Sequence, residues 1–337
     1  MAATITDVAR LAGVSHQTVS RVLNDEGTVR PATRAKVEDA MTQLRYRPSA
    51  AARALATKRT GTIGLVSSGS ALYGPSSIMI AFNEAARRAG YQVSIASLTV
   101  ADRVAMLDAV DRLLRQDVEA LVLIAPDRVS LEAIQGLELG VPLVAAESSG
   151  QSGLHSVSID QYAGARMATA HLAELGHRCI AHLAGPAESL DALERERGWR
   201  AELEHRNLAP GPLRVGDWLA ESGYQHGREL AGLPDVTAVF SSNDQMALGL
   251  LHAFADMGRP APDGVSVVGF DDIPEAAHYQ PPLTTVRQDF SELGRRILAE
   301  VLDALRRGPG GPLARMEPHL VERGSTGRLA TPPRRPD

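Results

Sequence analysis

Residues 4–24 read TITDVARLAGVSHQTVSRVLN, and this stretch decides the fold of the first part of the chain. Apolar residues recur at helical spacing on both sides of Gly13, which predicts two short amphipathic helices that meet at a tight turn. Thr4 with Asp7, and then Ser15, supply side-chain oxygens that can cap the two helix starts. The stretch therefore predicts a helix-turn-helix.

The second of these helices would present polar side chains outward. Hydroxyl, imidazole, amide and guanidinium groups are the ones that read base edges and phosphates in DNA. The residues concerned are Ser15, His16, Gln17, Ser20 and Arg21. The alternative is a helical hairpin whose polar face is only solvated, and the choice between the two depends on the rest of the chain.

Charge is distributed unevenly along the sequence. Residues 1–59 contain ten Lys and Arg against five Asp and Glu, a net charge of +5, whereas the whole chain of 337 residues has a net charge of -5. The remaining 278 residues therefore carry a net charge of -10. A basic head on an acidic body fits a module that binds phosphates, joined to a body that does not.

Other features of the composition exclude several classes of protein. The one cysteine, Cys179, rules out an internal disulfide, and its apolar neighbours indicate a buried structural thiol. We find no signal peptide and no apolar run long enough to span a bilayer, so we expect a cytoplasmic protein with no membrane partner. Motifs of the type Gly-x-Ser-x-Gly, P-loop or His-Glu-x-x-His are missing, so we expect no enzyme, no cofactor and no metal site.

Two further segments precede residue 60. Apolar residues between Val37 and Leu44 repeat at helical spacing behind Pro31, which predicts a third helix that can close a small core. Residues 49–58 are rich in alanine and have a high helix propensity, but an isolated helix of this length is marginal in water. This segment is therefore either a linker or a helix that forms only when it is docked.

From Thr60 onward, short apolar runs alternate with amphipathic stretches, which predicts parallel sheets covered by helices in two α/β lobes. The predicted strands are Thr62–Val66, Val93–Ser97, Ala120–Ile124, Pro142–Ala146, Cys179–Ala184, Ala238–Ser241 and Val265–Phe270. The predicted helices lie near 76–89, 101–116, 129–138, 161–175, 190–206, 222–231 and 244–257. Ligands of such sheets bind at the carboxyl ends of the strands, so the residues just after each strand are expected to form a site.

Many short motifs resemble the lactose-repressor (LacI/GalR) family, in order and over essentially the whole length. In the head they are Asp-Val-Ala, Ala-Gly-Val-Ser, Gln-Thr-Val-Ser-Arg-Val-Leu-Asn and Arg-Tyr-Arg-Pro. The body is most similar to the repressor that gives the family its name, through ALYGPS (71–76), AGP (184–186), GW (198–199), GDW (216–218), NDQMALG (243–249), GFDD (269–272) and PPLTTVRQDF (281–290). Their number and near-constant offsets carry the resemblance, rather than any one motif.

The resemblance implies an α/β fold with an N-terminal helix-turn-helix head and a hinge helix, followed by a two-lobed core of the periplasmic-binding-protein type with parallel sheets. The expected domains are the head at 1–47, the hinge at 48–59, the core at 60–327 and a disordered tail at 328–337. The first lobe would comprise 60–159 and 289–317, and the second lobe 160–288 and 318–327, with crossings near Ile159-Asp160 and Gln288-Asp289. The family also implies a homodimer that binds a pseudo-palindromic operator in double-stranded DNA.

Within the head, His16, Gln17 and Arg21 match the positions of the family's specificity residues. Glutamine can bond adenine and arginine can bond guanine through two hydrogen bonds. The residues interpreted as phosphate contacts, which position the protein without specifying a sequence, are Thr4, Ser15, Thr18, Ser20, Asn24, Thr33 and Arg34.

In the hinge, Leu55 matches the family's leucine that wedges into the minor groove at the centre of the operator. An apolar wedge between base steps kinks DNA toward the major groove. Ala52 and Arg53 would line the groove beside it. Because a lone short helix has little to bury Leu55, folding of the hinge should be coupled to DNA binding.

The resemblance also implies an effector pocket between the lobes. Trp218 can stack on a sugar ring, with a core tryptophan as the alternative, and Arg195, Asn243 and Asp271 match a trio that hydrogen-bonds sugar hydroxyls. The local sequence around Arg195, an alternation of Glu and Arg, instead suggests a solvated helix face. The full set of expected effector-binding residues is Leu72, Gly74, Pro75, Ile78, Glu147, Asp191, Arg195, Trp218, Asn243, Asp271, Gln288 and Phe290.

Four expected pocket positions depart from the repressor that gives the family its name. Glu147 stands where that protein has aspartate, and Asp191 replaces a serine. Ile124 replaces an asparagine, and Ile159 replaces an aromatic residue. The pocket should therefore be more acidic on one side and less polar on another.

These observations favour a sequence-specific DNA-binding transcriptional repressor that is released by a small, galactoside-like sugar inducer. One alternative is a purine-type co-repressor, but purines need aromatic stacking from two sides, and only Trp218 and Phe290 offer rings. A second alternative is a sugar-binding transport component, which the head and the missing export signal oppose. Asp271 and Asp272 could suggest a metal or phosphoacceptor site, but no ligand set with firm spacing completes it.

Overall fold

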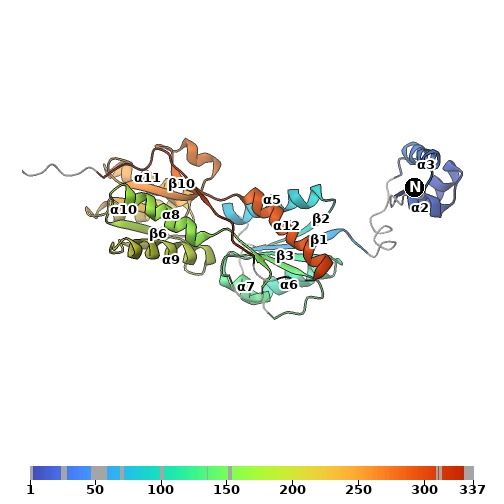
Figure 1. Cartoon of the computed structure of the whole chain (residues 1–337), viewed down its shortest axis with the longest axis horizontal. Coiled ribbons are helices and arrows are strands. Elements are labelled where there is room, and N and C mark those ends of the chain that lie inside the picture. The colour runs from blue at the N-terminus through green and yellow to red at the C-terminus, as the bar shows by residue number, and fades with distance from the viewer. Residues whose placement is uncertain are drawn as a thin grey trace, which may run out of the picture. The chain divides into compact units, whose positions relative to one another are not determined.

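The computed structural model describes residues 3–23, 29–46, 59–68, 72–98, 102–134, 136–150, 154–308, 310 and 313–329. Internal contacts divide the chain into two units, Met1–Gly61 and Thr62–Asp337 (Figure 1). None of the helices in the described ranges is long and apolar enough to cross a membrane.

The first unit packs three helices around a small apolar core. They are α1 (Ile5–Ala12), α2 (His16–Leu23) and α3 (Pro31–Gln43). At the start of α1 the Asp7 backbone N–H donates to Thr4 Oγ1 at 3.3 Å, while the Thr4 N–H donates to the Asp7 carboxylate at 2.9 Å. Gly13, with a φ of 66°, ends α1 and makes the turn in the left-handed conformation that favours glycine. The predicted helix-turn-helix is confirmed.

The first lobe of the second unit is built on a five-stranded parallel sheet in the order β2-β1-β3-β4-β5. Its strands are β1 (Thr62–Ser68), β2 (Gln92–Leu98), β3 (Ala120–Ile124), β4 (Leu143–Ala146) and β5 (Ser156–Val157). One face packs against α5 (Tyr73–Arg88) and α12 (Phe290–Arg307), and the other against α6 (Arg103–Leu114) and α7 (Arg128–Ile134) (Figure 1). Because both faces are covered, β3 is apolar and buried along its whole length.

The second lobe is built on a six-stranded sheet in the order β11-β10-β9-β8-β6-β7, in which β11 alone runs antiparallel to its neighbour. Its strands are β6 (Ile180–Ala184), β7 (Leu213–Val215), β8 (Ala238–Ser241), β9 (Ser266–Asp271), β10 (Thr284–Arg287) and β11 (His319–Val321). Its helices are α8 (Gln161–Glu174) and α9 (Leu190–His205) on one face, and α10 (Ala220–Ala231) and α11 (Asp244–Asp256) on the other.

The chain passes between the two sheets three times. It leaves the first sheet after β5 and enters α8, and it returns from β10 to α12. The third passage runs from Met316, which pairs with Ile159 beside the first sheet, to β11. In each lobe the first strand lies between the second and the third, so the carboxyl ends of neighbouring parallel strands form an edge suited to a ligand.

Several elements were not predicted from local periodicity. They are the strands β5, β7, β10 and β11 and the long helix α12. A strand of two or three residues has no readable period, and Pro281-Pro282 just before β10 argue against a strand there. The helix predicted near 129–138 ends at Ile134, ahead of Gly136 with a φ of 77°.

Candidate functional site

The exposed polar face of α2 carries the side chains expected to meet DNA. Ser15, His16, Gln17 and Arg21 are exposed, whereas Thr18, Ser20, Thr33 and Arg34 are half-buried. Ser15 Oγ also accepts the Thr18 backbone N–H at 3.2 Å, and the exposed Thr4 hydroxyl donates to Asp7 at 2.7 Å. Asn24, Ala52, Arg53 and Leu55 lie outside the described residues, so the expectations for the hinge stay predictions.

In the second unit a cavity of about 160 Å³ lies where the strands of the two lobes end. Its lining includes residues from the carboxyl ends of β3, β4, β5, β8, β9 and β10. All twelve residues expected from the resemblance to bind an effector line this cavity: Leu72, Gly74, Pro75, Ile78, Glu147, Asp191, Arg195, Trp218, Asn243, Asp271, Gln288 and Phe290. The structure therefore brings together residues that are more than 200 positions apart in the sequence.

Arg195 is the centre of a buried polar network on the second-lobe side of the cavity. The guanidinium donates from Nε to Gln161 Oε1 at 2.9 Å and also donates to the backbone carbonyl of Ser242. The residue is only 3% exposed, so the solvated helix face suggested by its neighbours in the sequence is wrong for Arg195. Its guanidinium also stacks 4.0 Å from the centre of the Phe270 ring, which fixes the plane of its donors.

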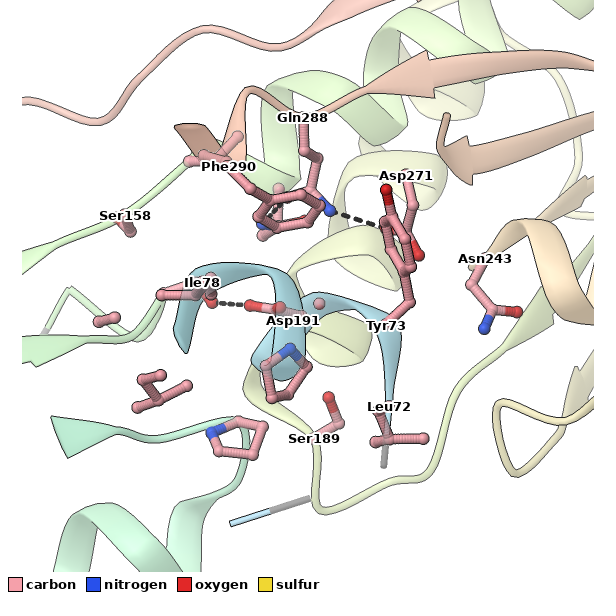
Figure 2. Close-up of a pocket in the computed structure, with 18 of the residues that line it drawn as sticks. Leu72, Tyr73, Ile78, Ser158, Ser189, Asp191, Asn243, Asp271, Gln288 and Phe290 are labelled. Carbon is pink, nitrogen blue, oxygen red and sulfur yellow. Dashed lines mark hydrogen bonds between the residues drawn. The ribbon is translucent and has the colours of Figure 1, made fainter. Parts of the chain in front are cut away.

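Asp271 completes a ring of contacts that runs from Arg195 through Gln161 and Gln288. Gln161 donates to Gln288 at 2.8 Å, and Asp271 lies 3.7 Å from Arg195. Gln288 donates to Asp271 at 2.7 Å (Figure 2). Burial raises the pKa of Asp271 from 3.8 to about 6, even though Arg195 and the Gln288 amide favour the charged form. These side chains thus hold fixed hydrogen-bond donors and acceptors at the cavity.

The opposite wall comes from the first lobe and is mainly apolar. Leu72, Pro75 and Ile78 lie at the start of α5, and Ile124 and Ile159 extend the wall from the sheet. Phe290 at the start of α12 packs edge-on against Tyr73, with ring centres 5.8 Å apart. The cavity therefore has a polar side and an apolar side.

Trp218 stands at the edge of the cavity and depends on a glycine. A Cβ at Gly185 would lie 2.3 Å from two atoms of the indole ring, so only glycine leaves space for the ring there. Asn243, the N-cap of α11, donates from its amide to the Trp218 carbonyl at 2.9 Å and accepts the Met246 backbone N–H at 2.9 Å. The other amide hydrogen of Asn243 reaches Gln245, so this side chain holds Trp218 in place.

Two further carboxylates face the cavity. Asp191, in the first turn of α9, accepts the Ser148 hydroxyl from the other lobe and lies 3.8 Å from Arg195. Glu147 is 5% exposed; one carboxylate oxygen accepts the Ser149 N–H at 2.5 Å, and the other has no hydrogen-bond partner among the described residues. Asp272, by contrast, bonds Arg287 and Arg323 at 2.6 Å each and does not line the cavity.

Three residues of the site were not predicted. Gln161 joins Arg195 to Gln288, and Ser148 contacts Asp191 across the lobes. Tyr73 packs on Phe290 and lies beside Asp271 (Figure 2). Gln161 directly follows the crossing expected near Ile159-Asp160, and Ser148 directly follows Glu147. Their nearness to these points is the signal that could have found them.

A helix-turn-helix unit on the same chain as a two-lobed α/β core with a buried polar cavity defines a DNA-binding regulator with a small-molecule pocket. A model of the bacterial regulatory proteins of the lacI family matches residues 4–49, and a model of the periplasmic binding protein-like domain matches residues 169–326. The lactose operon repressor of Escherichia coli (strain K12) is 38% identical over 301 residues, which cover 89% of this chain and 84% of that protein.

Solved structures agree with these matches. The lac repressor dimer bound to operator and the anti-inducer ONPF has a TM-score of 0.89 at 36% identity, covering 97% of this chain and 100% of that chain. A complex of the transcriptional regulator CelR with cellobiose has a TM-score of 0.71 at 32% identity, covering 96% and 99%. The chain belongs to the lacI family of bacterial regulatory proteins and is a DNA-binding transcriptional repressor of that family.

Proposed function

We propose that the protein binds a pseudo-palindromic operator in double-stranded DNA as a homodimer, and that a galactoside-like sugar releases it. The observation that carries this proposal is the division of the pocket into two sides. Arg195, Asp271 and Gln288 offer hydrogen-bonding groups on one side, and Leu72 and Ile78 offer apolar contact on the other.

This arrangement suits a pyranose ring. Adjacent hydroxyls both donate and accept, so a guanidinium and a carboxylate held side by side can bind two of them. The face of a sugar ring carries C–H groups, which pack on an aromatic surface such as Trp218. A site that is built to bond hydroxyls rejects analogues that lack them, because its buried polar groups are then left without partners.

The pocket also suits a switch. Most of its polar groups belong to the second lobe, and its apolar wall together with Glu147 belongs to the first, so a bound sugar touches both lobes at once. A ligand shifts a conformational equilibrium by the difference between its affinities for the two states. A sugar that fits one arrangement of the lobes better than the other would therefore change the affinity for operator.

DNA recognition is assigned to the head. His16, Gln17 and Arg21 lie exposed on α2, where they can enter a major groove and bond base edges. The homodimer is supported by the related lac repressor, which is a dimer on its operator. Two copies of the head would read the two halves of a pseudo-palindromic site.

The test is operator binding by fluorescence anisotropy, with an operator selected from a random-sequence pool and a panel of galactosides, glucosides and purines. Galactosides should release the wild type. Arg195→Ala should retain operator binding but need roughly 10- to 100-fold more sugar for release, since a hydrogen bond to a charged group contributes about 1.5–3 kcal/mol. Arg200→Ala, an exposed arginine on the same helix, is the control and should behave like the wild type.

Two results would overturn the proposal. If no sugar releases the wild type while a purine strengthens operator binding, the protein is a co-repressor switch instead. If glucosides alone release it, the effector is a sugar but the galactoside assignment is wrong.

A further inference from the structure

The charges that line the pocket are out of balance. Four charged side chains face the cavity in the described chain, and three of them are the acidic residues Glu147, Asp191 and Asp271. The fourth is Arg195. Buried charges are normally paired, because taking an ion out of water without a partner is costly. A pocket lining with two more acidic than basic groups therefore requires an explanation.

Two of the three guanidinium nitrogens of Arg195 already donate to other groups. Its donors reach Gln161 and the Ser242 carbonyl, and its remaining nitrogen lies 3.7 Å from Asp271 and 3.8 Å from Asp191. No ion pair joins it to Glu147, and none joins any other described cation to Glu147. The single guanidinium thus serves the two carboxylates of the second lobe and leaves the carboxylate of the first lobe without a counter-ion.

Glu147 is also short of hydrogen bonds. The residue is 5% exposed and lines the cavity just after β4. Its Oε1 atom has no hydrogen-bond partner among the residues that the structure describes. Ser148, its neighbour in the chain, donates to Asp191, so a carboxylate of the second lobe contacts the residue next to Glu147. A buried carboxylate oxygen without a hydrogen-bond donor is costly, so a ligand should supply that donor. Because Glu147 also has no counter-ion among the described residues, the donor should carry a positive charge.

We propose that the effector is an amino sugar whose protonated amino group binds Glu147. This inference rests on the proposed sugar-binding function and narrows the class of sugar. A neutral hydroxyl would satisfy the orphaned oxygen of Glu147 but would leave its charge unbalanced, whereas an ammonium group does both. A hydroxyl and an ammonium both form a charge-assisted hydrogen bond with a carboxylate, but only the ammonium adds the attraction between two opposite charges. The sugar hydroxyls keep their places on Arg195, Asp271 and Gln288.

The test compares three sugars by isothermal titration calorimetry with the full chain at pH 6.5: galactose, galactosamine and N-acetylgalactosamine. The acetyl group removes the charge and leaves the nitrogen. Galactosamine should bind more tightly than galactose by about 10-fold or more, because a tenfold change corresponds to about 1.4 kcal/mol and the attraction between two charges at hydrogen-bond distance near a protein surface exceeds that. The preference should fall as the pH rises and the amine loses its proton.

Variants separate the pocket from the surface charge. Glu147→Gln should abolish the preference for galactosamine, while Glu138→Gln, an exposed glutamate of the same lobe, should retain it. Glu147→Gln should also raise the melting temperature of the ligand-free protein, because it removes an unpaired buried charge and lets the side-chain carbonyl still accept the Ser149 N–H.

The possible results distinguish a failure of the amino-sugar inference from a failure of the proposed sugar-binding function. Equal binding of galactose and galactosamine, unchanged by Glu147→Gln, would overturn the amino-sugar inference and leave the sugar-binding function standing. If none of the three sugars binds and none releases operator, the proposed function fails with it. A melting temperature lowered by Glu147→Gln would show that the carboxylate already has a partner, and would also overturn the inference.

Discussion

Asp271→Asn separates the role of this carboxylate in binding from its effect on folding. The substitution keeps the shape of the side chain, and its carbonyl oxygen can still accept the Gln288 amide. Asparagine also tolerates the φ of 110° found at this position better than most residues do. Arg195 keeps its bonds to Gln161 and Ser242, and Asp191 stays 3.8 Å away as its counter-ion.

The magnitude follows from the pKa of Asp271, which burial raises from 3.8 to about 6. Below pH 3.8 the carboxyl is protonated in both folded and unfolded chains and has no pH-dependent effect. As the pH rises the unfolded chain ionises first, so the folded state is progressively destabilised. The penalty is about 1 kcal/mol at pH 4.5 and levels off at about 3 kcal/mol above pH 6, at 1.36 kcal/mol per pKa unit.

Asp271→Asn should therefore be more stable than the wild type at pH 8, and its advantage should be about 2 kcal/mol smaller at pH 4.5. Urea unfolding at both pH values and at one protein concentration measures this difference. Asp263→Asn, an exposed carboxylate of the same lobe, controls for the loss of one charge. The variant should retain operator binding and lose release by sugar. The reasoning would be refuted if Asp271→Asn exceeded the wild type in unfolding free energy by the same amount at both pH values. It would also be refuted if the variant were less stable than the wild type at pH 8.

Two other substitutions test the second lobe. Burial between Trp199 and Phe240 lowers the pKa of His182 from 6.5 to about 3, so the folded state loses about 2 kcal/mol between pH 7.5 and pH 5 through this residue. His182→Gln should lack that part of the acid sensitivity in urea unfolding, and an unchanged pH dependence would contradict the assignment. Gly185→Ala should push the Trp218 ring out of place and weaken sugar binding at least tenfold in calorimetry without loss of operator affinity. Gly232→Ala, whose Cβ would lie 3.3 Å from one backbone oxygen, is its control, and equal sugar affinity in both variants would show that Trp218 does not contact the ligand.

The parts of the fold that could be predicted are those with a strong local period. Residues 4–24 fix two helices because the capping oxygens, the glycine turn and the apolar spacing all agree. The buried strands β3 and β8 were predicted to the residue, since an apolar run covered on both faces is readable without a partner. Strands β5 and β7 could not be found in this way, because pairing with a neighbour defines them and two or three residues carry no period.

In the pocket, the local sequence could not predict which side chains are buried. Local sequence placed Arg195 on a solvated helix face, because it stands among alternating Glu and Arg residues. What buries it is Gln161 on α8 and the Ser242 carbonyl after β8, neither of which is near it in the sequence. The resemblance to a family supplied the position of Arg195, but not Gln161, which closes the network.

For Asn243 the sequence predicted the position of the residue in the pocket but not the hydrogen bonds that its side chain makes. The resemblance gave it a bond to a sugar hydroxyl, and it does line the pocket. Yet its side-chain carbonyl caps α11, and its two amide hydrogens reach the Trp218 carbonyl and Gln245. An asparagine directly before a helix is also the residue type that capping favours, so the sequence alone does not separate the two tasks. In the structure the amide of Asn243 holds the backbone of Trp218, the residue that presents the indole at the cavity. A ligand at the cavity could then use only the second lone pair of the Asn243 carbonyl, because the amide hydrogens already have partners.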